Sequence, residues 1–277
     1  MDWPEYWIAA SWTENAQVHG VFTSRHGGQS AGPYGAGDGS LGARTGGMNL
    51  GSHVGDDPAV VAANRARLGA LSGGLQVAYL DQVHGTDVAD LDAWDRRSVP
   101  QADAAVTTTP GLAACVLVAD CLPVLFAAPD GSAVGAAHAG WRGLAGGVLE
   151  NTLKAVCGKA QCEASAVQVW LGPAIGPQHF EVGEDVRQAF VGQHAESASA
   201  FRMTRPGKWM ADLFLLARLR LRAAGVPTSS VQGGGVCTVS ERQGYYSFRR
   251  DRITGRQAGL VWIAAPGATT QRQGRPR

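Results

Sequence analysis

The amino-acid sequence predicts one α/β domain in which helices cover a β-sheet. Short apolar runs bounded by turn residues alternate with longer amphipathic segments, which is the pattern of strands and helices in such a fold. The 277 residues include 45% hydrophobic and 17% charged side chains, a composition typical of a globular protein with a substantial core. The chain has no internal repeat and no dividing linker. We therefore predict an N-terminal segment over residues 1–17, one domain over 18–266 and a disordered tail over 267–277.

The N-terminal part of this domain is predicted to contain a strand, a long loop and a helix. Residues 18–23 form an apolar run typical of a strand. A Gly-rich loop follows over 24–47, and loops of this length usually carry function or are mobile. Asp57 and Pro58 then supply an N-cap and a first-turn proline. The helix that they begin is expected to end near 72–74.

Strands dominate the middle of the chain, and helices alternate with strands after it. The further predicted strands are 76–80, 103–107, 112–118, 124–128, 132–137, 167–171 and 258–264. The further predicted helices are 141–156, 183–191 and 210–224. Residues 113–118 are apolar at every position, which predicts a strand that is covered on both faces.

Charge and cysteine content exclude several classes of protein. The formal net charge of +1 gives no electrostatic reason to expect nucleic acid or a membrane as the main partner. Five scattered cysteines do not form a disulfide framework. The sequence has no signal-peptide pattern and no apolar stretch approaching roughly 18 residues. We expect a cytoplasmic protein with reduced thiols.

Two histidines and one cysteine are the strongest candidates for a functional site. His84, Cys121 and His138 each lie beside Gly or Pro at the end of a predicted strand, where α/β sheets usually place their sites. Two imidazoles and one thiolate suit zinc, with a fourth position left for water or substrate. Taken alone, each is equally well explained as a satisfied polar residue or a buried thiol. The three together favour a metal site.

Polar residues beside these candidates could support the chemistry. Asp81, Gln82 and Asp120 are next to proposed ligands and could orient an imidazole or accept a proton. The alternative is that the two aspartates only cap local turns. For Asp120 the functional role is slightly favoured.

Arginines in several Gly- and Ser-containing segments are candidates for binding phosphate, because the guanidinium fork matches phosphate and carboxylate. They are Arg25, Arg65, Arg142 and Arg249-Arg250. Any single one is more often a surface or salt-bridging residue. Arg142 is the best phosphate candidate, because it follows His138 at the start of a predicted helix, whose N-terminus adds backbone N–H groups.

Together these segments resemble the YfiH family, also called the laccase-domain or multicopper polyphenol oxidase family. The matching stretches are 23–28, 49–51, 81–85, 119–123, 138–143, 172–176, 234–238 and 247–250. They follow the family's order over roughly residues 20 to 263, so no single short motif carries the resemblance. The loop over 30–48 is longer and richer in Gly than the family pattern.

The resemblance implies a fold, a cofactor and an activity. It implies a single-domain sandwich of mixed β-sheet layers covered by helices, and zinc bound by His84, Cys121 and His138. It implies phosphorolysis of adenosine, inosine and S-methyl-5'-thioadenosine, and deamination of adenosine. The partners would be purine nucleosides and phosphate, and the protein a monomer or homodimer. The residues expected in catalysis are Cys121, Asp120 and Arg142, and those expected to bind substrate are Arg25, Asn49, Arg65, Gln82 and Arg250.

Three alternatives to a zinc-dependent nucleoside enzyme stay open. The first is a copper-dependent polyphenol oxidase, although seven histidines without a His-x-His pair argue against a multicopper centre. A single copper ion in the His/Cys/His shell is compatible with the sequence. The second is a hydrolase that edits cell-wall peptide precursors with Cys121 as nucleophile. The third is a binding protein without catalysis.

Overall fold

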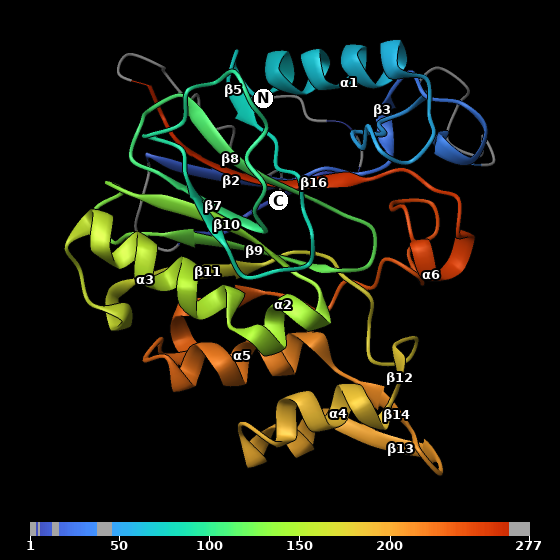
Figure 1. Ribbon diagram of the computed structural model, residues 1–277. Helices are drawn as coiled ribbons and strands as arrows, with labels where there is room; N and C mark the ends of the chain where they lie inside the picture. The colour runs from blue at the N-terminus through green and yellow to red at the C-terminus, as the bar shows by residue number, and fades with distance from the viewer. Residues whose placement is uncertain (1–3, 5, 13–16, 38–45, 266–277) are drawn as a thin grey trace, which may run out of the picture.

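The computed structural model describes residues 4, 6–12, 17–37 and 46–265 of the chain (Figure 1). Two β-sheets pack face to face, and helices cover the outer face of each sheet, so the domain has four layers. The predicted α/β sandwich is therefore confirmed. The interior between the sheets is apolar and includes Phe22, Val116 and Val261 from one sheet, and Leu125 and Val134 from the other.

The first sheet has five strands and is covered by one helix. Its order is β1 (Ile8–Ala9), β2 (Val18–Phe22), β16 (Gln257–Ile263), β8 (Leu112–Val118) and β5 (Gln76–Ala78). The last strand, β16, lies between β2 and β8 and is antiparallel to both. Helix α1 (Pro58–Leu71) covers the outer face, as Figure 1 shows, and buries Leu68 against Ala113 and Cys115. Asp57 caps α1 by accepting a hydrogen bond from the amide of Ala59 at 2.8 Å.

The second sheet has six strands and carries most of the site. Its order is β15 (Val231–Gly233), β11 (Gln168–Leu171), β9 (Leu122–Ala127), β10 (Val134–Ala139), β7 (Ala104–Thr107) and β6 (Val88–Asp90). Helices α2 (Trp141–Gly146), α3 (Val148–Ala160) and α5 (Leu213–Ala223) cover its outer face. The single helix predicted over 141–156 is broken at Gly147, whose φ of 105° lies in the left-handed region that favours glycine.

A small third sheet lies beyond α5 (Figure 1). It contains β12 (Glu181–Gly183), β14 (Lys208–Ala211) and β13 (Phe201–Arg205), beside α4 (Glu184–Val191). The prediction of a helix from residue 210 is wrong at its start, because 208–211 pairs with β12 and β13. The helix begins after Asp212, whose carboxylate accepts a hydrogen bond from the amide of Leu215.

Short elements connect the sheets around the site. They are β3 (His26–Gly28), β4 (Gly46–Gly47), α6 (Phe248–Asp251) and the 3-10 turns Gly32–Tyr34, Ala164–Ala166, Ala195–Ala200 and Thr228–Ser230. The loop predicted over 24–47 thus contains two short strands and a 3-10 turn, and its residues 38–45 lie outside the described part of the chain.

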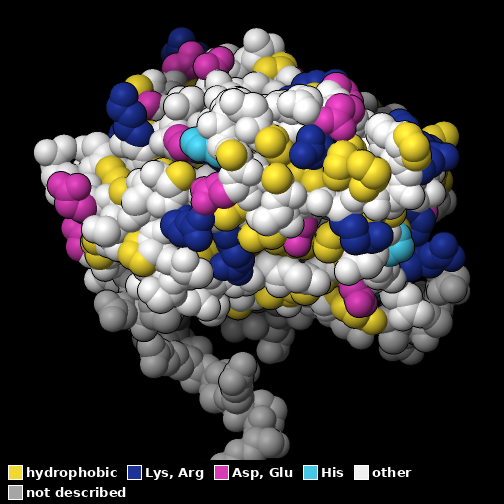
Figure 2. Space-filling view, turned by 90° about the horizontal axis from the view of Figure 1, so that it is seen from below, with side chains coloured by type: hydrophobic (Ala, Val, Ile, Leu, Met, Phe, Trp, Pro, Cys, Tyr) yellow, Lys and Arg dark blue, Asp and Glu magenta, His cyan; other side chains and the backbone are white. Residues whose placement is uncertain are grey.

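The predicted boundaries can be compared with the structure only in part. Within the N-terminal segment 1–17, β1 pairs with β2, so this piece of it is built into the first sheet. The predicted tail 267–277 lies outside the described residues. No helix in the described part of the chain is long and apolar enough to cross a membrane. Seen from below, acidic and basic side chains are interspersed with apolar ones (Figure 2), as the net charge of +1 leads one to expect.

Candidate metal centre and adjoining cavities

His84, Cys121 and His138 meet at one point of the structure. Their possible ligand atoms all lie within 4.8 Å of one another. Sγ of Cys121 is 3.9 Å from Nε2 of His84, and the two imidazole rings meet edge to face at 4.8 Å between centroids. Exposure falls from His84, which is exposed, through Cys121 to His138, which is buried. The cluster therefore opens to solvent on the side of His84.

The buried carboxylate of Asp103 fixes the loop that carries His84. Its oxygens accept hydrogen bonds from the backbone amides of Val83, His84 and Gly85 at 3.1, 2.9 and 2.6 Å. This support is needed because His84 has a φ of 62°, which is uncommon for a residue with a side chain. Asp103 directly precedes β7, and the position of this strand in the sheet places the carboxylate beside the loop.

Asp103 also orients the second imidazole. Its Oδ1 lies 2.8 Å from Nδ1 of His138, and both side chains are buried. This contact leaves Nε2 of His138 directed at the cluster, which is the arrangement of a metal-binding histidine held by a carboxylate. Burial raises the pKa of Asp103, but the hydrogen bonds from His138 and the loop amides outweigh it and lower the pKa.

A second buried carboxylate, Asp120, fixes the turn that carries Cys121. Asp120 has a φ of 89°, again in the left-handed region. Its side chain accepts hydrogen bonds from the hydroxyls of Thr238 and Ser247 at 2.6 and 3.0 Å and from the amide of Arg249 at 2.6 Å. These three hydrogen bonds hold the turn that carries Cys121. The catalytic role of Asp120 stays a prediction.

The cluster itself favours a thiolate. Burial raises the pKa of the Cys121 thiol, but the charge of His138 and hydrogen bonds with both histidines lower it to about 6. Burial lowers the pKa of His138, but the Cys121 thiolate and Asp103 raise it to about 9. The two side chains stabilise each other's charged forms, so Cys121 is prepared as an anionic ligand.

Gly140 keeps the space between the ligands open. A Cβ atom at this position would lie 2.9 Å from Cδ2 of His84 and 3.1 Å from Sγ of Cys121. The backbone of Gly140, with φ −64° and ψ 158°, is one that alanine adopts freely. The added methyl group would therefore act on the ligands and not on the fold.

We expect Gly140→Ala to lower metal affinity at least about 10-fold with little change in thermal stability, because the methyl group displaces two ligands. Metal titration monitored by a chromophoric chelator measures this change. Gly158→Ala is the matched control, since a Cβ there meets no atom within 4 Å. Unchanged metal affinity in Gly140→Ala would show that the ligands do not converge as described.

A large cavity opens onto the cluster. It has a volume of about 710 Å³, and all three cluster residues line it. Arg65 and Arg256 form a cationic wall of this cavity, and His53 lines it beside them. Burial lowers the pKa of His53, and the charges of Arg256 and Arg65 lower it further, because the three side chains lie close together.

A smaller cavity adjoins the first. It measures about 150 Å³ and shares Ala119, Cys121 and Phe248 with the large cavity. The rings of Trp141 and Phe180 also line it. Cys121 thus lines both a cavity with two arginines in its wall and a smaller one with three aromatic rings.

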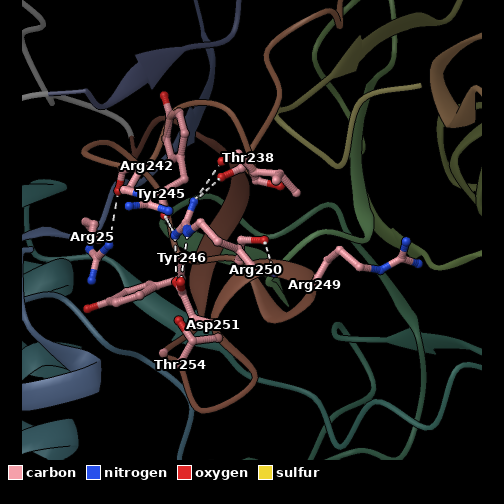
Figure 3. A network of polar contacts seen from close by, with 12 residues as sticks. Arg25, Thr238, Arg242, Tyr245, Tyr246, Arg249, Arg250, Asp251 and Thr254 are labelled. Carbon is pink, nitrogen blue, oxygen red and sulfur yellow. Dashed lines mark hydrogen bonds and ion pairs between the residues drawn. The ribbon is translucent and has the colours of Figure 1, made fainter. Parts of the chain in front are cut away.

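Three of the predicted substrate-binding residues bind neighbouring loops instead. Arg250 donates to the carbonyls of Thr238, Val239 and Tyr245 and pairs with Asp251, as Figure 3 shows in part. Arg25 donates to the carbonyls of Gly35 and Arg242. Asn49 bonds with Gly51 and Asp56 and accepts a hydrogen bond from the amide of Arg256. None of the three is among the residues that line these two cavities, and their hydrogen bonds hold neighbouring loops in place. Their contact with substrate stays a prediction.

The other predicted residues lie in different places. Gln82 lines the large cavity, and its side chain also bonds with both backbone groups of Leu117 at 2.8 and 2.9 Å. Arg65 lines the same cavity and stacks on Tyr79 at 3.9 Å. Arg142 is exposed, stacks on Trp141 and lines neither cavity. The predicted phosphate contact of Arg142 therefore lies outside these two cavities and stays a prediction.

Sequence reasoning missed Asp103, His53, Arg256 and Phe248. Arg256 lies after the last stretch that resembles the family, 247–250, and Asp103 was predicted only as the first residue of the strand 103–107. Their proximity arises from tertiary structure, because β16 places Arg256 beside α1 and β7 places Asp103 beside β10. The only sign of Asp103 in the sequence was that a carboxylate stands directly before an apolar strand.

Comparison with known proteins shows similarity along most of the chain. The family described as multi-copper polyphenol oxidoreductase laccase matches residues 19–264. A purine nucleoside phosphorylase of Pseudomonas aeruginosa is 45% identical over 258 residues, covering 93% of this chain and 98% of the relative. The Escherichia coli protein named purine nucleoside phosphorylase YfiH is 42% identical over 92% of this chain and 98% of its own. A crystal structure of the Neisseria meningitidis protein NMB0706 is similar with a TM-score of 0.85 and 44% identity, covering 94% of this chain and 100% of that one.

Proposed function

The chain belongs to the YfiH family of multi-copper polyphenol oxidoreductase laccase domains, and on this premise we propose that it is a zinc-dependent purine nucleoside phosphorylase. The observation that carries the proposal is the cationic wall of the large cavity, which faces the His/Cys/His cluster. Relatives named purine nucleoside phosphorylase support the substrate class. The proposed substrates are inosine, adenosine and S-methyl-5'-thioadenosine.

The donor set fits zinc. Two nitrogens and one thiolate sulfur at about 2.0–2.3 Å from a tetrahedral ion stand roughly 3.5 Å apart. The 3.9 Å between Cys121 and His84 is close to this value, and Asp103 leaves Nε2 of His138 free to bind. When bound, zinc supplies Lewis acidity at a fourth position open to the large cavity.

Phosphate binding is proposed for Arg65 and Arg256. Nε of Arg65 donates to the carbonyl of Leu50, and Nη1 of Arg256 to those of Thr254 and Gly255, which hold the two side chains in place. Among the described residues, Nη1 of Arg65 and Nη2 of Arg256 have no protein acceptor. These donors and the two positive charges suit a phosphate anion.

Phosphorolysis breaks the bond between C1' of the sugar and the base and forms a bond from C1' to a phosphate oxygen. The arginines hold the phosphate and offset its charge as it approaches the sugar. The leaving base takes up one proton. This division of roles places the phosphate in the large cavity, with the sugar beside the cluster.

Deamination of adenosine is proposed as a second activity of the same cavity. It requires a carboxylate that carries protons between water and the leaving ammonia. Asp81 lines the large cavity and is exposed, whereas the carboxylate of Asp120 is occupied by three donors. We therefore propose Asp81 for this role in place of Asp120.

We expect Arg65→Ala to raise the KM for phosphate about 10- to 100-fold while metal content stays unchanged, because one charge-assisted contact is lost. Steady-state kinetics with varied phosphate measure this change. Arg67→Ala, on the same helix but lining neither cavity, is the control. If only Arg142→Ala raises the KM for phosphate, the phosphate binds at the start of α2 instead.

The test of the proposed function is a product assay combined with metal analysis. Purified protein is incubated with inosine or adenosine, with and without phosphate. Hypoxanthine or adenine formed only with phosphate supports phosphorolysis, and inosine from adenosine supports deamination. Absence of all three products would overturn the proposal. Stoichiometric copper together with phenol oxidation would favour the oxidase. Among the described residues, however, the cluster of His84, Cys121 and His138 is the only group of three or more His, Cys, Asp or Glu side chains that could hold a metal ion.

A further inference from the structure

The smaller cavity differs in chemistry from the large one. Its lining combines the rings of Trp141, Phe180 and Phe248 with the buried aliphatic side chains of Ile175 and Leu213. Two charged residues, Asp120 and Arg249, also line it, and both already have protein partners: Asp120 accepts three hydrogen bonds, and Arg249 donates to the carbonyl of His179. The three rings suit a planar group that stacks.

We propose that the smaller cavity receives the purine base, with the ring of Phe248 as its stacking surface. This inference rests on the proposed function and deepens it, because it divides the nucleoside between the two cavities. The sugar and phosphate lie in the large cavity against Arg65 and Arg256, and the base lies on the other side of Cys121.

The sizes and the shared wall support this division. The large cavity has about 710 Å³ and the small one about 150 Å³. A complete small-molecule pocket usually exceeds about 300 Å³, so the small cavity takes only a fragment of a ligand. Both cavities are lined by Ala119, Cys121 and Phe248, so two fragments of one ligand could contact the same three residues. Phosphorolysis joins phosphate to the sugar and releases the base. The sugar phosphate matches the cavity lined by arginines, and the base matches the cavity lined by aromatic rings.

Phe248 is placed for contact with a ligand. Its side chain is 47% exposed, although it is one of the largest apolar residues. Its position is fixed by Ser247, which caps α6 by accepting from the amide of Arg250 and donates to Asp120. A fixed, half-open aromatic ring at the entrance to a cavity offers a π face to a planar base.

The experiment compares Phe248→Ala and Phe248→Leu with Phe248→Tyr. The leucine variant keeps apolar volume without a π face, and the tyrosine variant keeps the ring. Inhibition constants for hypoxanthine and for ribose 1-phosphate are measured as products of inosine phosphorolysis. We expect Phe248→Ala and Phe248→Leu to weaken hypoxanthine binding and to raise the KM for inosine, by about 10- to 100-fold for alanine. Ribose 1-phosphate inhibition and kcat change little, and Phe248→Tyr restores hypoxanthine binding.

The controls separate this inference from the proposed function. Ile253→Ala removes another exposed apolar side chain, one that lines neither cavity, and it leaves hypoxanthine binding unchanged. Metal content and melting temperature identify any variant that is damaged generally. If the unaltered protein is a phosphorylase but hypoxanthine inhibits it and Phe248→Leu equally, the base does not stack on Phe248 and the proposed function stands. If the unaltered protein cleaves no purine nucleoside, both are overturned.

Discussion

Replacing His84 or His138 with alanine is expected to abolish stoichiometric metal binding and nucleoside turnover. Each variant leaves two protein ligands for the ion, which is fewer than the three of a catalytic zinc site. The two variants differ in stability. His84 is exposed on a loop, so its loss costs little, whereas loss of the buried His138 leaves the Asp103 carboxylate without its imidazole partner. We expect His138→Ala to unfold at lower temperature than His84→Ala, with both chains folded at room temperature.

Metal analysis and thermal unfolding measure these effects. His194→Ala is a suitable control, because His194 precedes the 3-10 turn Ala195–Ala200 and lines neither cavity. Stoichiometric zinc in His84→Ala or His138→Ala would refute the proposed metal centre. Full activity after exhaustive chelation would instead favour hydrolysis with Cys121 as nucleophile.

Replacing Asp103 is expected to damage both the metal site and the fold. Asp103→Ala leaves three loop amides and Nδ1 of His138 without their acceptor, which lowers the free energy of unfolding by roughly 2–4 kcal/mol. Asp103→Asn keeps the shape but loses the charge that holds the imidazole. We expect it to reduce metal affinity about 10- to 100-fold, as for other residues that orient a metal-binding histidine.

Chemical denaturation and metal titration measure the two effects of Asp103 separately. Asp130→Asn is the control, because Asp130 is exposed and its carboxylate bonds only within its own turn, to Ser132. If Asp103→Asn binds metal as tightly as the unaltered protein, Asp103 acts on the fold alone. A small loss of stability in Asp103→Ala would mean that the left-handed loop at His84 supports itself.

The layers of the fold were predictable because the strands are continuous apolar runs. β8 was predicted with its observed bounds, and α1 begins at the predicted Pro58. The metal cluster was predictable because its three residues lie at or near strand ends. The sequence did not show that these strands belong to both sheets: β5 and β8 precede His84 and Cys121 in the first, and β10 contains His138 in the second. Strand β14 was not predicted, because its apolar residues lead into those of α5 with only Asp212 between them. Pairing with β12 and β13, and the cap that Asp212 provides, separate the two elements.

The roles of the arginines could not be read from the sequence. Arg25 and Arg250 donate hydrogen bonds to carbonyl groups of other loops. Arg65, in contrast, has one guanidinium nitrogen without a protein acceptor among the described residues. These side chains are chemically identical, and their uses differ only through tertiary contacts. For the same reason the sequence did not reveal that Asp103 and Asp120 hold the turns that carry His84 and Cys121.

The position of β16 has a consequence for biosynthesis. This strand is the last of the described chain, yet it lies between β2 and β8 at the centre of the first sheet. During translation β2 is made early and can pair with β1 on one side, but its other edge lacks a partner until residues 257–263 have been synthesised. A nascent chain therefore carries an apolar strand with one open edge for much of its elongation, which exposes it to aggregation. Ribosome-associated chaperones are expected to matter more for this protein than for one whose neighbouring strands follow each other in sequence.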